Sequence, residues 1–430
     1  MHRWYPVSGG WKQARRALYC GVLAVTTGLA AGCGGGSGGD GDGGIVDGCG
    51  SWPELTVVGS GTGHSAVSAL VVLDDCNVVI AGYEGSTRAG QVEGDSHGFV
   101  RRLTLSSSGV QVRWERLVDT SGSDAILTLE RDGEQLLFTG FVSGTLEGQT
   151  SQGKKDVVIG SLDLEGRTNS LSQLGNARPN VPLRRLVLPS GEQLLVGNDE
   201  VYVPTNFVER WEDPWIAGIT EQASGFVMDW IANANTDTGD IYGAALAYDY
   251  TALLGLNVGG GGNAGIHLQA RTATGALYWS QPISPMPYDA ISDMALDANG
   301  NLLVLGTTYL TLGESALGGG DYFLLQADPA TGQLQRIDQF GTGRLDWARR
   351  LLVDGNRRIV LGDESDGAWP WSLAIRVLAA DGSETARMER TFGQSSQVQG
   401  AALAPGGIFV TGNHQPQTGP ERGYVAFLQL

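Results

Sequence analysis

Residues 297–306 of this chain have the sequence DANGNLLVLG, and residues 319–323 have the sequence GGDYF. The first stretch joins a tight Asn-Gly turn to an apolar strand that ends in glycine, and the second starts another apolar strand just after an aspartate. The apolar run that ends in glycine recurs along the chain, at Gly82, Gly140, Gly197, Gly255, Gly306, Gly362 and Gly412. Seven copies, about 50 to 60 residues apart, predict seven units of one repeated fold.

A second landmark keeps the same spacing: a polar residue, one spacer, and then an apolar strand. It begins at His97, Asp156, Asp213, Asn263, Asp321, Trp371 and Arg422. Tight turns before the first landmark and after the second separate two further strands, so each unit has four strands, A to D. Helical periodicity is absent, which excludes βα solenoids. The sequence therefore predicts an all-β chain that forms a seven-bladed β-propeller of four-stranded antiparallel blades.

The motifs at 297–306 and 319–323 resemble a bacterial β-propeller repeat family often abbreviated SBBP. Copies in that family combine D-x-x-G-N, a hydrophobic run ending in glycine, and G-G-x-D-x-F. The resemblance covers nearly all of residues 53–430, although His97, Asn263, Trp371 and Arg422 occupy the position of the aspartate in four units. It implies the propeller architecture and says little about a ligand.

The seventh unit ends at Leu430 after its third strand, so its fourth strand must come from elsewhere. Residues 55–59 have the sequence LTVVG, which is similar to the ends of the D strands at 337–341 and 390–393. We expect them to pair outside residues 424–429, close the ring, and remove an unpaired strand edge.

The N-terminus predicts export and a lipid anchor. A basic segment ending at Arg16 precedes an apolar stretch at 17–31, and LAAGC at 29–33 resembles a bacterial lipobox in which Cys33 receives the lipid. We expect residues 1–32 to be a lipoprotein signal peptide, 33–51 the lipidated cysteine and a glycine-rich tether, and 52–430 the propeller. Gly34 favours the outer membrane of the cell envelope. The alternative is an ordinary secretory signal in which the cysteine is incidental.

Two cysteines remain in an oxidising compartment after the leader is removed and Cys33 is lipidated. These are Cys49 and Cys76, for which we predict a disulfide; the alternative is two thiols.

The chain is acidic, with a net charge of −18, and removal of the leader's four basic residues lowers this to −22. Such a surface repels nucleic acid and anionic lipid, so we expect no nucleic-acid partner, membrane attachment by the lipid only, and a monomer.

The connections between strands B and C are long and lie with the D–A connections on one face, while the other turns are short. We place any ligand on this loop face, because binding residues concentrate in long loops on a rigid scaffold. Exposed aromatics there would suit a glycan or protein ligand, but we favour the other interpretation, that some of them fill gaps between blades. The candidates are Tyr202, Trp211, Tyr309, Trp347 and Trp369.

Several A strands begin with aspartate, which places a ring of carboxylates at the mouth of the central channel: Asp124, Asp240, Asp289 and Asp346. A channel cation is one interpretation, and caps of the D–A turns, which we favour, are the other. We expect no cofactor and no metal.

The histidines lack metal-ligand spacing, and no nucleophile motif stands out. The sequence thus favours a binding or scaffolding protein that is not an enzyme. The alternative is an extracellular polysaccharide hydrolase or lyase that acts on the same face.

Overall fold

The computed structural model describes residues 51–59, 63–85, 95–106, 108–203, 208–233, 241–258, 265–284, 289–313, 316–365 and 371–430. For residues 200–203 and 208–212 it describes the backbone only. The described ranges contain strands and no helix, and therefore no helix long and apolar enough to cross a membrane.

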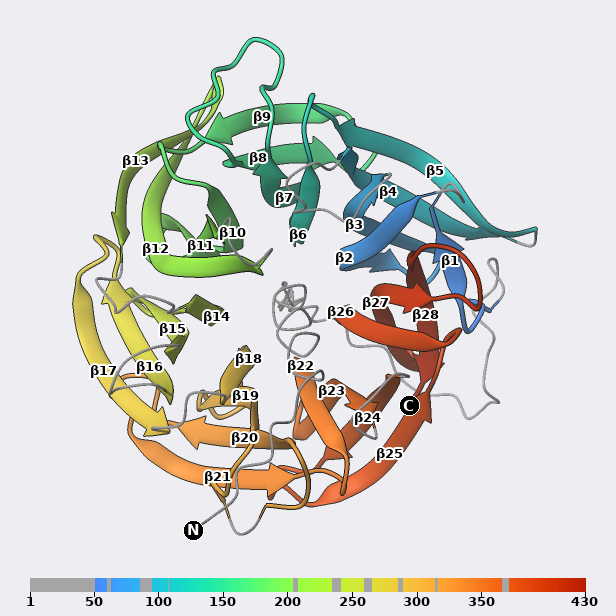
Figure 1. Ribbon diagram of the computed structural model, residues 1–430, viewed down its shortest axis with the longest axis vertical. Coiled ribbons are helices and arrows are strands. Elements are labelled where there is room, and N and C mark those ends of the chain that lie inside the picture. Colours follow the sequence, from blue (N-terminus) through green and yellow to red (C-terminus); the bar gives the residue numbers. More distant parts are fainter. Residues whose placement is uncertain are drawn as a thin grey trace, which may run out of the picture.

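The described strands form seven antiparallel four-stranded sheets that stand as blades around a central axis (Figure 1). The predicted seven-bladed all-β propeller is confirmed. Each blade runs outward from strand A beside the axis to strand D at the rim. Sequential strands are neighbours in every blade except the last.

The strands of the first three blades, from the centre outward, follow the chain. Blade one contains β2 (His64–Asp74), β3 (Asn77–Gly85), β4 (Ser96–Ser106) and β5 (Gly109–Val118). Blade two contains β6 (Ala125–Asp132), β7 (Gln135–Val142), β8 (Asp156–Asp163) and β9 (Thr168–Leu174). Blade three contains β10 (Asn180–Val187), β11 (Gln193–Val203), β12 (Val208–Gln222) and β13 (Gly225–Asn233).

The next three blades repeat this order. Blade four contains β14 (Ile241–Tyr248), β15 (Thr251–Val258), β16 (Gly265–Thr272) and β17 (Leu277–Ser284). Blade five contains β18 (Ala290–Leu296), β19 (Leu302–Thr308), β20 (Asp321–Ala327) and β21 (Leu334–Phe340). Blade six contains β22 (Leu345–Asp354), β23 (Arg357–Ser365), β24 (Ser372–Leu378) and β25 (Glu384–Arg390).

Blade seven closes the ring with strands from both ends of the chain, as predicted. It contains β26 (Ser395–Ala404), β27 (Gly407–Gln415), β28 (Arg422–Gln429) and, on the outside, β1 (Thr56–Val58). The antiparallel register pairs Thr56 with Val425 and Val58 with Gly423. The buried Ser65 hydroxyl joins the two strands, because it donates to the Val58 carbonyl (3.0 Å) and accepts from the Gly423 amide (2.9 Å).

Every A strand contains a one-residue β-bulge, which explains the glycine landmark. The bulge lies opposite that glycine in six blades and one residue farther along in blade four. The bulged backbone occupies the place of a side chain: a Cβ on Gly140 would lie 2.0 Å from the Ala125 carbonyl oxygen. In six of the seven blades the recurring glycine is thus required by a close backbone approach, and in blade four Gly255 makes room for the Ile291 side chain.

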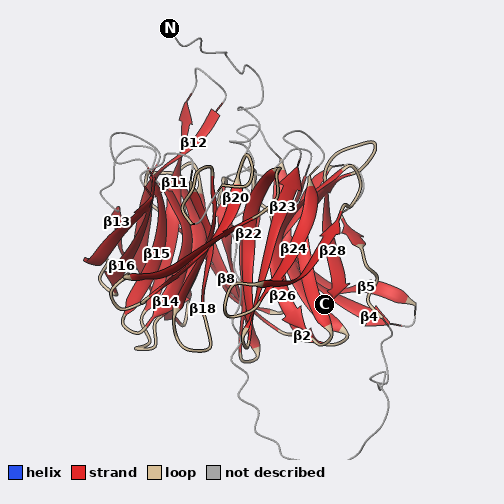
Figure 2. Ribbon diagram, turned by 90° about the horizontal axis from the view of Figure 1, so that it is seen from below, coloured by secondary structure: helices blue, strands red, loops and turns tan. Residues whose placement is uncertain are grey.

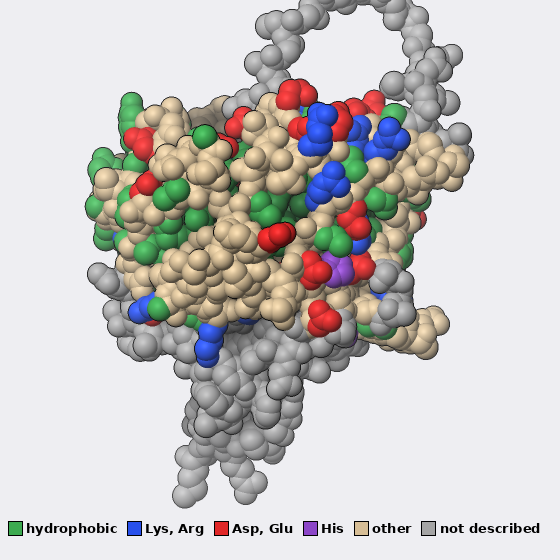
Figure 3. Space-filling view, turned by 90° about the horizontal axis from the view of Figure 1, so that it is seen from above, with side chains coloured by type: hydrophobic (Ala, Val, Ile, Leu, Met, Phe, Trp, Pro, Cys, Tyr) green, Lys and Arg blue, Asp and Glu red, His purple; other side chains and the backbone are tan. Residues whose placement is uncertain are grey.

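The core lies between the blades, where apolar residues of facing sheets interdigitate. In the seam between blades six and seven, Leu361 and Ile375 pack with Val398, Val410 and Tyr424, all buried. Burying one such side chain contributes roughly 1.5–3 kcal/mol, so the seven seams together supply the main stabilisation of the ring. The outer wall carries scattered apolar side chains among polar ones (Figure 3).

One predicted loop is wrong. The B–C connection of blade three, expected as a loop over 198–212, is a two-stranded ribbon in which β11 and β12 stay paired as far as Val203 and Val208. It projects beyond the other strands (Figure 2). The β-branched and aromatic alternation from Val201 to Val203 favours extended backbone and explains the difference. The C strand therefore begins at Val208 rather than at Asp213.

Candidate functional site

The candidate site lies on the loop face of blades five and six. Tyr309 follows β19, Trp347 belongs to β22, and their ring centroids are 6.3 Å apart at an interplanar angle of 67°. Trp347 is only 4 % exposed, and the Arg349 guanidinium lies 5.9 Å from its ring centroid. The structure thus brings two predicted aromatics together, and the burial of Trp347 against Tyr309 of the neighbouring blade agrees with the favoured interpretation that such aromatics fill gaps between blades.

Asp289 holds the backbone of Tyr309 in place. Its backbone amide donates to the Asp289 carboxylate (3.1 Å), whose other oxygen accepts a hydrogen bond from the Ser284 hydroxyl (2.5 Å). Burial, followed by the nearby charge of Asp289, raises the pKa of Tyr309 to about 12. Its phenol is therefore protonated at neutral pH and can act as a hydrogen-bond donor.

The B–C loop of blade five is fixed by an aspartate–glutamine pair. Asp321 accepts hydrogen bonds from the Leu317 amide (2.8 Å) and from Nε2 of Gln339 (2.7 Å). The Gln339 carbonyl oxygen in turn accepts from the Leu312 amide (2.8 Å). The aspartate landmark of the sequence is therefore a cap for the loop that precedes it.

Blade two contains the same arrangement. Gln173 donates to Asp156 (2.7 Å) and accepts from the Leu146 amide (2.9 Å). Two blades thus hold their B–C loops rigidly by the same two side chains.

The fixed loop of blade five exposes apolar side chains. Leu310 is 40 % and Leu317 is 50 % exposed, and both lie in the same B–C loop as Tyr309. We call Tyr309, Leu310 and Leu317 the blade-five patch. Exposed aliphatic groups on a rigid loop are suited to contact with another apolar surface.

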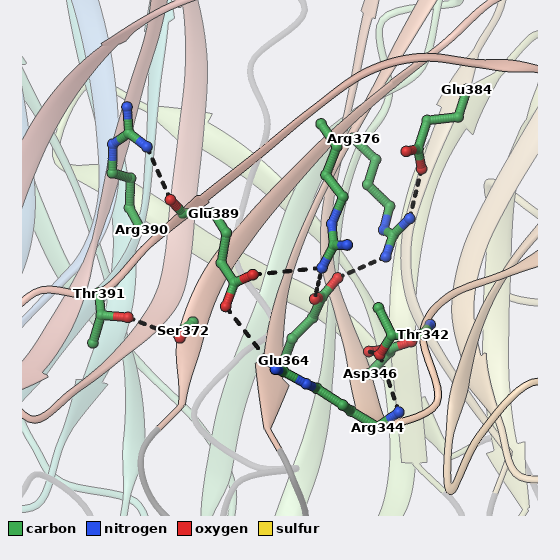
Figure 4. Close-up of polar contacts among 11 residues, drawn as sticks. Thr342, Arg344, Asp346, Glu364, Ser372, Arg376, Glu384, Glu389, Arg390 and Thr391 are labelled. Atoms are coloured by element: carbon green, nitrogen blue, oxygen red, sulfur yellow. Dashed lines mark hydrogen bonds and ion pairs between the residues drawn. The ribbon is translucent and has the colours of Figure 1, made fainter.

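The three described carboxylates of those expected at the channel mouth, Asp124, Asp289 and Asp346, are buried, each at most 4 % exposed. Asp124 accepts from the Thr120 amide (2.5 Å), the Thr120 hydroxyl (2.8 Å) and the Ser143 amide (3.1 Å). Asp346 binds the amide and hydroxyl of Thr342 in the same way (Figure 4). These are the hydrogen bonds of turn caps. Burial raises the pKa of Asp124 and of Asp346 to about 6. Asp240 lies outside the described residues.

Several other predicted residues cannot be placed in the site. Tyr202 and Trp211 belong to the blade-three ribbon, whose side chains are not described, and Trp369, Cys33 and Cys49 lie outside the described residues. The Cys49–Cys76 disulfide therefore stays a prediction. In its favour, the Trp52 indole donates to the carbonyl of Asp75, the neighbour of Cys76 (2.8 Å).

Sequence reasoning missed a buried charge network in blade six. Glu364 at the end of β23 pairs with Arg376 (2.9 Å) and with Arg387, and Arg376 also binds Glu384 (2.5 Å) (Figure 4). Blade one repeats the central pair, with 2.9 Å between Glu84 and Arg101. Arginine neutralises these carboxylates, so they do not form an acid–base pair for catalysis. No group of three or more His, Cys, Asp or Glu in the described residues could hold a metal.

A second charged group missed by sequence reasoning lies at the base of the blade-three ribbon. One nitrogen of Arg178 contacts both Asp199 (3.1 Å) and Asp213 (2.6 Å). Asp213 is the extra residue of a β-bulge and has φ of 58°, an unusual backbone for a residue with a side chain. No sequence signal predicted this kink.

A shallow cavity of about 230 Å³ lies on the short-turn face instead, between blades six and seven. Its lining includes Asp354, Arg357, Leu403 and Leu430. It lies on the face opposite the one where the long loops predicted a ligand.

No protein-family model matches the chain, and no curated protein is similar to it. The resemblance to the SBBP repeats therefore stays a prediction. Among solved structures, the chain is similar to Sqt1 from Chaetomium thermophilum, with 12% identity over 86% of this chain and 97% of that chain and a TM-score of 0.48. It is also similar to a PL25 polysaccharide lyase described as an ulvan lyase, with 10% identity over 85% and 94% and a TM-score of 0.49. Likenesses at this level assign no activity.

Proposed function

We propose that this protein is a lipid-anchored binding or scaffolding protein of the cell envelope that holds a protein partner on the blade-five patch. The observation that carries this proposal is the blade-five loop, whose described residues are held by Asp321 and Gln339 and in which Leu310 and Leu317 are exposed beside Tyr309. A preordered apolar surface binds a partner without the entropic cost of ordering a loop.

Two features favour a protein partner over a glycan. Trp347, the aromatic best placed to stack on a sugar ring, is buried. The exposed groups of the patch are aliphatic leucines, which complement apolar side chains rather than sugar hydroxyls.

The path of the chain supports an orientation for this surface. β1 runs antiparallel to β28 and enters from the short-turn face, where Trp52 contacts the turn at Asp75. A lipid on Cys33 would then hold the short-turn face toward the membrane and leave the blade-five patch pointing away from it.

The test is a pull-down from envelope extract with the mature chain, followed by identification of the captured proteins. We expect a partner that the wild type retains and that the double variant Leu310→Asp/Leu317→Asp loses. Leu277→Asp is the matched control, because Leu277 is 53 % exposed but lies on the outer strand of blade four.

Equal capture by the wild type and the patch variant would contradict the proposal. Depolymerisation of a polysaccharide by the purified chain would favour the hydrolase or lyase alternative. The anchor is tested separately by Cys33→Ala, which should move the protein from the membrane fraction to the soluble fraction.

A further inference from the structure

His414 lies buried where the ring closes, in the seam between blades six and seven. It is the penultimate residue of β27 and is 6 % exposed. Its ring meets the Tyr424 ring edge-on, with centroids 6.3 Å apart. On the blade-six side, a Cβ on Gly393 would lie 2.9 Å from the imidazole Nδ1, so the ring fits closely under that connection.

Polar atoms of His414 and of its neighbour Ser396 lack hydrogen-bond partners in the described residues. Among the described residues, neither ring nitrogen of His414 has a hydrogen-bond partner. The hydroxyl of Ser396, which lies directly opposite His414 on β26, also has none there. An unpaired buried polar group is destabilising, so such a cluster needs an explanation.

The charges around His414 oppose a proton on it. Arg422 is the residue paired with His414 on β28, and no carboxylate in the described ranges accepts a hydrogen bond from the imidazole. Glu421, the neighbour of Arg422, binds the Asn413 amide instead (3.2 Å).

The remaining elements around the ring add no free negative charge. Blade six contributes Phe392 next to Tyr424, with ring centroids 5.2 Å apart. The charged pair deeper in the seam, Arg349 with Asp363, is closed at 2.6 Å. Burial, followed by the charge of Arg422, lowers the pKa of His414.

Three hydrogen bonds near His414 join blades six and seven on the loop face. The Gln394 amide donates to the Gln415 carbonyl (2.7 Å), and the Ser396 amide donates to the Trp371 carbonyl (3.0 Å). The Trp371 amide donates to the Ser395 hydroxyl (3.1 Å). Movement of the His414 ring would disturb these three contacts, because they are made by Gln415, the next residue, and by Ser395 and Ser396, which pair with Gln415 and His414.

We propose that His414 makes the seam between blades six and seven sensitive to acid, so that uptake of a proton there loosens the ring at its closing blade. Well above pH 6.5 the imidazole is neutral in both the folded and the unfolded chain and contributes no pH dependence. Below it, the unfolded chain binds the proton and the folded chain resists it, so stability falls until the folded pKa is reached. The effect on the unfolding equilibrium constant is at most tenfold per pH unit.

Buried aspartates act in the opposite direction, so the test must use a difference between variants. Asp124, Asp199 and Asp346 have pKa values raised to about 6 by burial. They take up protons more readily in the folded chain, so their contribution to stability is fully present below pH 3.8 and is lost as the pH rises through 6. This contribution is common to the wild type and a His414 variant and cancels in their ratio.

The experiment is urea unfolding of the full mature chain between pH 5 and pH 8, for the wild type, His414→Phe and the control His267→Phe. At pH 7.5 we expect His414→Phe to be at least as stable as the wild type, because it removes two unpaired nitrogens. As the pH falls below 6.5, the unfolding constant of the wild type should rise relative to that of His414→Phe, by up to tenfold per unit. His267 is a partly exposed residue of β16, and its variant should parallel the wild type.

Hydrogen exchange locates the effect. In the wild type, exchange at the amides of Gln394 and Ser396 should accelerate on acidification after correction for intrinsic rates. The Leu105 amide, which donates to the Cys76 carbonyl within blade one (2.7 Å), is the reference. Parallel pH profiles of wild type and His414→Phe, or unchanged protection at the seam, would overturn the proposal. If His414→Phe does not fold, His414→Gln, which is also uncharged throughout, must give the same ratio.

Discussion

The absence of a Cβ atom explains why glycine recurs in the B strands. In six blades the landmark glycine of the B strand lies against the backbone of the A strand, and a Cβ on Gly412 would lie 1.9 Å from the Gln397 carbonyl oxygen; Gly255 of blade four lies against the Ile291 side chain instead. Backbone cannot move aside as a flexible side chain can. The glycine is therefore needed for the bulge, and the bulge is present in all seven A strands.

We expect Gly140→Ala to destabilise the protein by about 1–3 kcal/mol, the usual cost of forcing an extra group into a packed site. A Cβ there would lie 2.0 Å from the Ala125 carbonyl oxygen and 2.8 Å from the Ile126 Cα. Urea unfolding measures the change. Gly319→Ala is the control, because no atom lies within 4 Å of its Cβ position, and it should stay within about 0.5 kcal/mol of the wild type. Equal stability of the two variants would refute the steric explanation.

Sequence patterns located these glycines but not the polar residues beside them. Asn198, directly after the glycine of blade three, accepts from the Tyr242 amide (2.8 Å) and donates to the Tyr242 carbonyl (3.1 Å). Asn257 forms the same pair of bonds with Ile291 of the next blade. An asparagine after a strand ordinarily indicates a turn, and nothing local tells that its partner is a neighbouring blade.

At the scale of the element, the loops divide into two kinds. In blades two and five a capping aspartate and a glutamine hold the B–C loop against its own blade. In blade three the strands continue as a ribbon that bends at Asp213 and pairs only with itself beyond Asp199. The ribbon therefore contributes little to the stability of the ring of blades.

Replacing residues 200–211 by Asn-Gly should leave the melting temperature within a few degrees of the wild type. Asp199 and Glu212 are paired directly in the ladder, so a two-residue turn can join them without strain. Asp199 also keeps its hydrogen bond from Asn180 (2.8 Å). Thermal unfolding followed by circular dichroism measures the effect. A melting temperature lower by ten degrees or more would mean that the ribbon packs on the ring of blades.

The strands were largely predictable from sequence. Alternating apolar and polar residues indicate a strand and turn residues indicate its ends, and neither signal depends on which strands lie beside it in the fold. The ribbon was not, since Pro204, Thr205 and Asn206 interrupt its short alternation and resemble a loop. The candidate site was predicted only as a face. Exposure depends on packing between blades, so sequence could not show that Trp347 is buried while Leu310 and Leu317 are exposed.

For the whole molecule, closure depends on three residue pairs between β1 and β28 and on the contacts beside them. Trp52 packs edge-on against Phe409, with ring centroids 5.1 Å apart, and Glu54 pairs with Arg390 of blade six (2.9 Å). The N-terminal segment thus touches blades one, six and seven together. Loss of these contacts would affect every seam between blades, because each blade is held by its two neighbours.

Ser65→Ala should lower the free energy of unfolding by about 1–3 kcal/mol. The change leaves the Gly423 amide without its acceptor and the Val58 carbonyl without its donor at a buried position. Urea unfolding gives the value, and hydrogen exchange should show β1 opening before the other strands. Ser372→Ala, which removes only an exposed hydroxyl contact with Thr391, should change stability by less than about 0.5 kcal/mol. A silent Ser65 variant would show that β1 is not needed for closure.

The shared blade also decides where this chain could be cut and rejoined. β1 begins beside the end of β28 on the same face, so a few linking residues between Leu430 and Pro53 would make the two strands an ordinary hairpin, like the C–D pair of the other six blades. The connections between blades then become interchangeable as chain ends. A circular permutant opened between β21 and β22, for example, would have no split blade, and its stability compared with that of the natural order would measure how much the molecule depends on sharing one blade between its two ends.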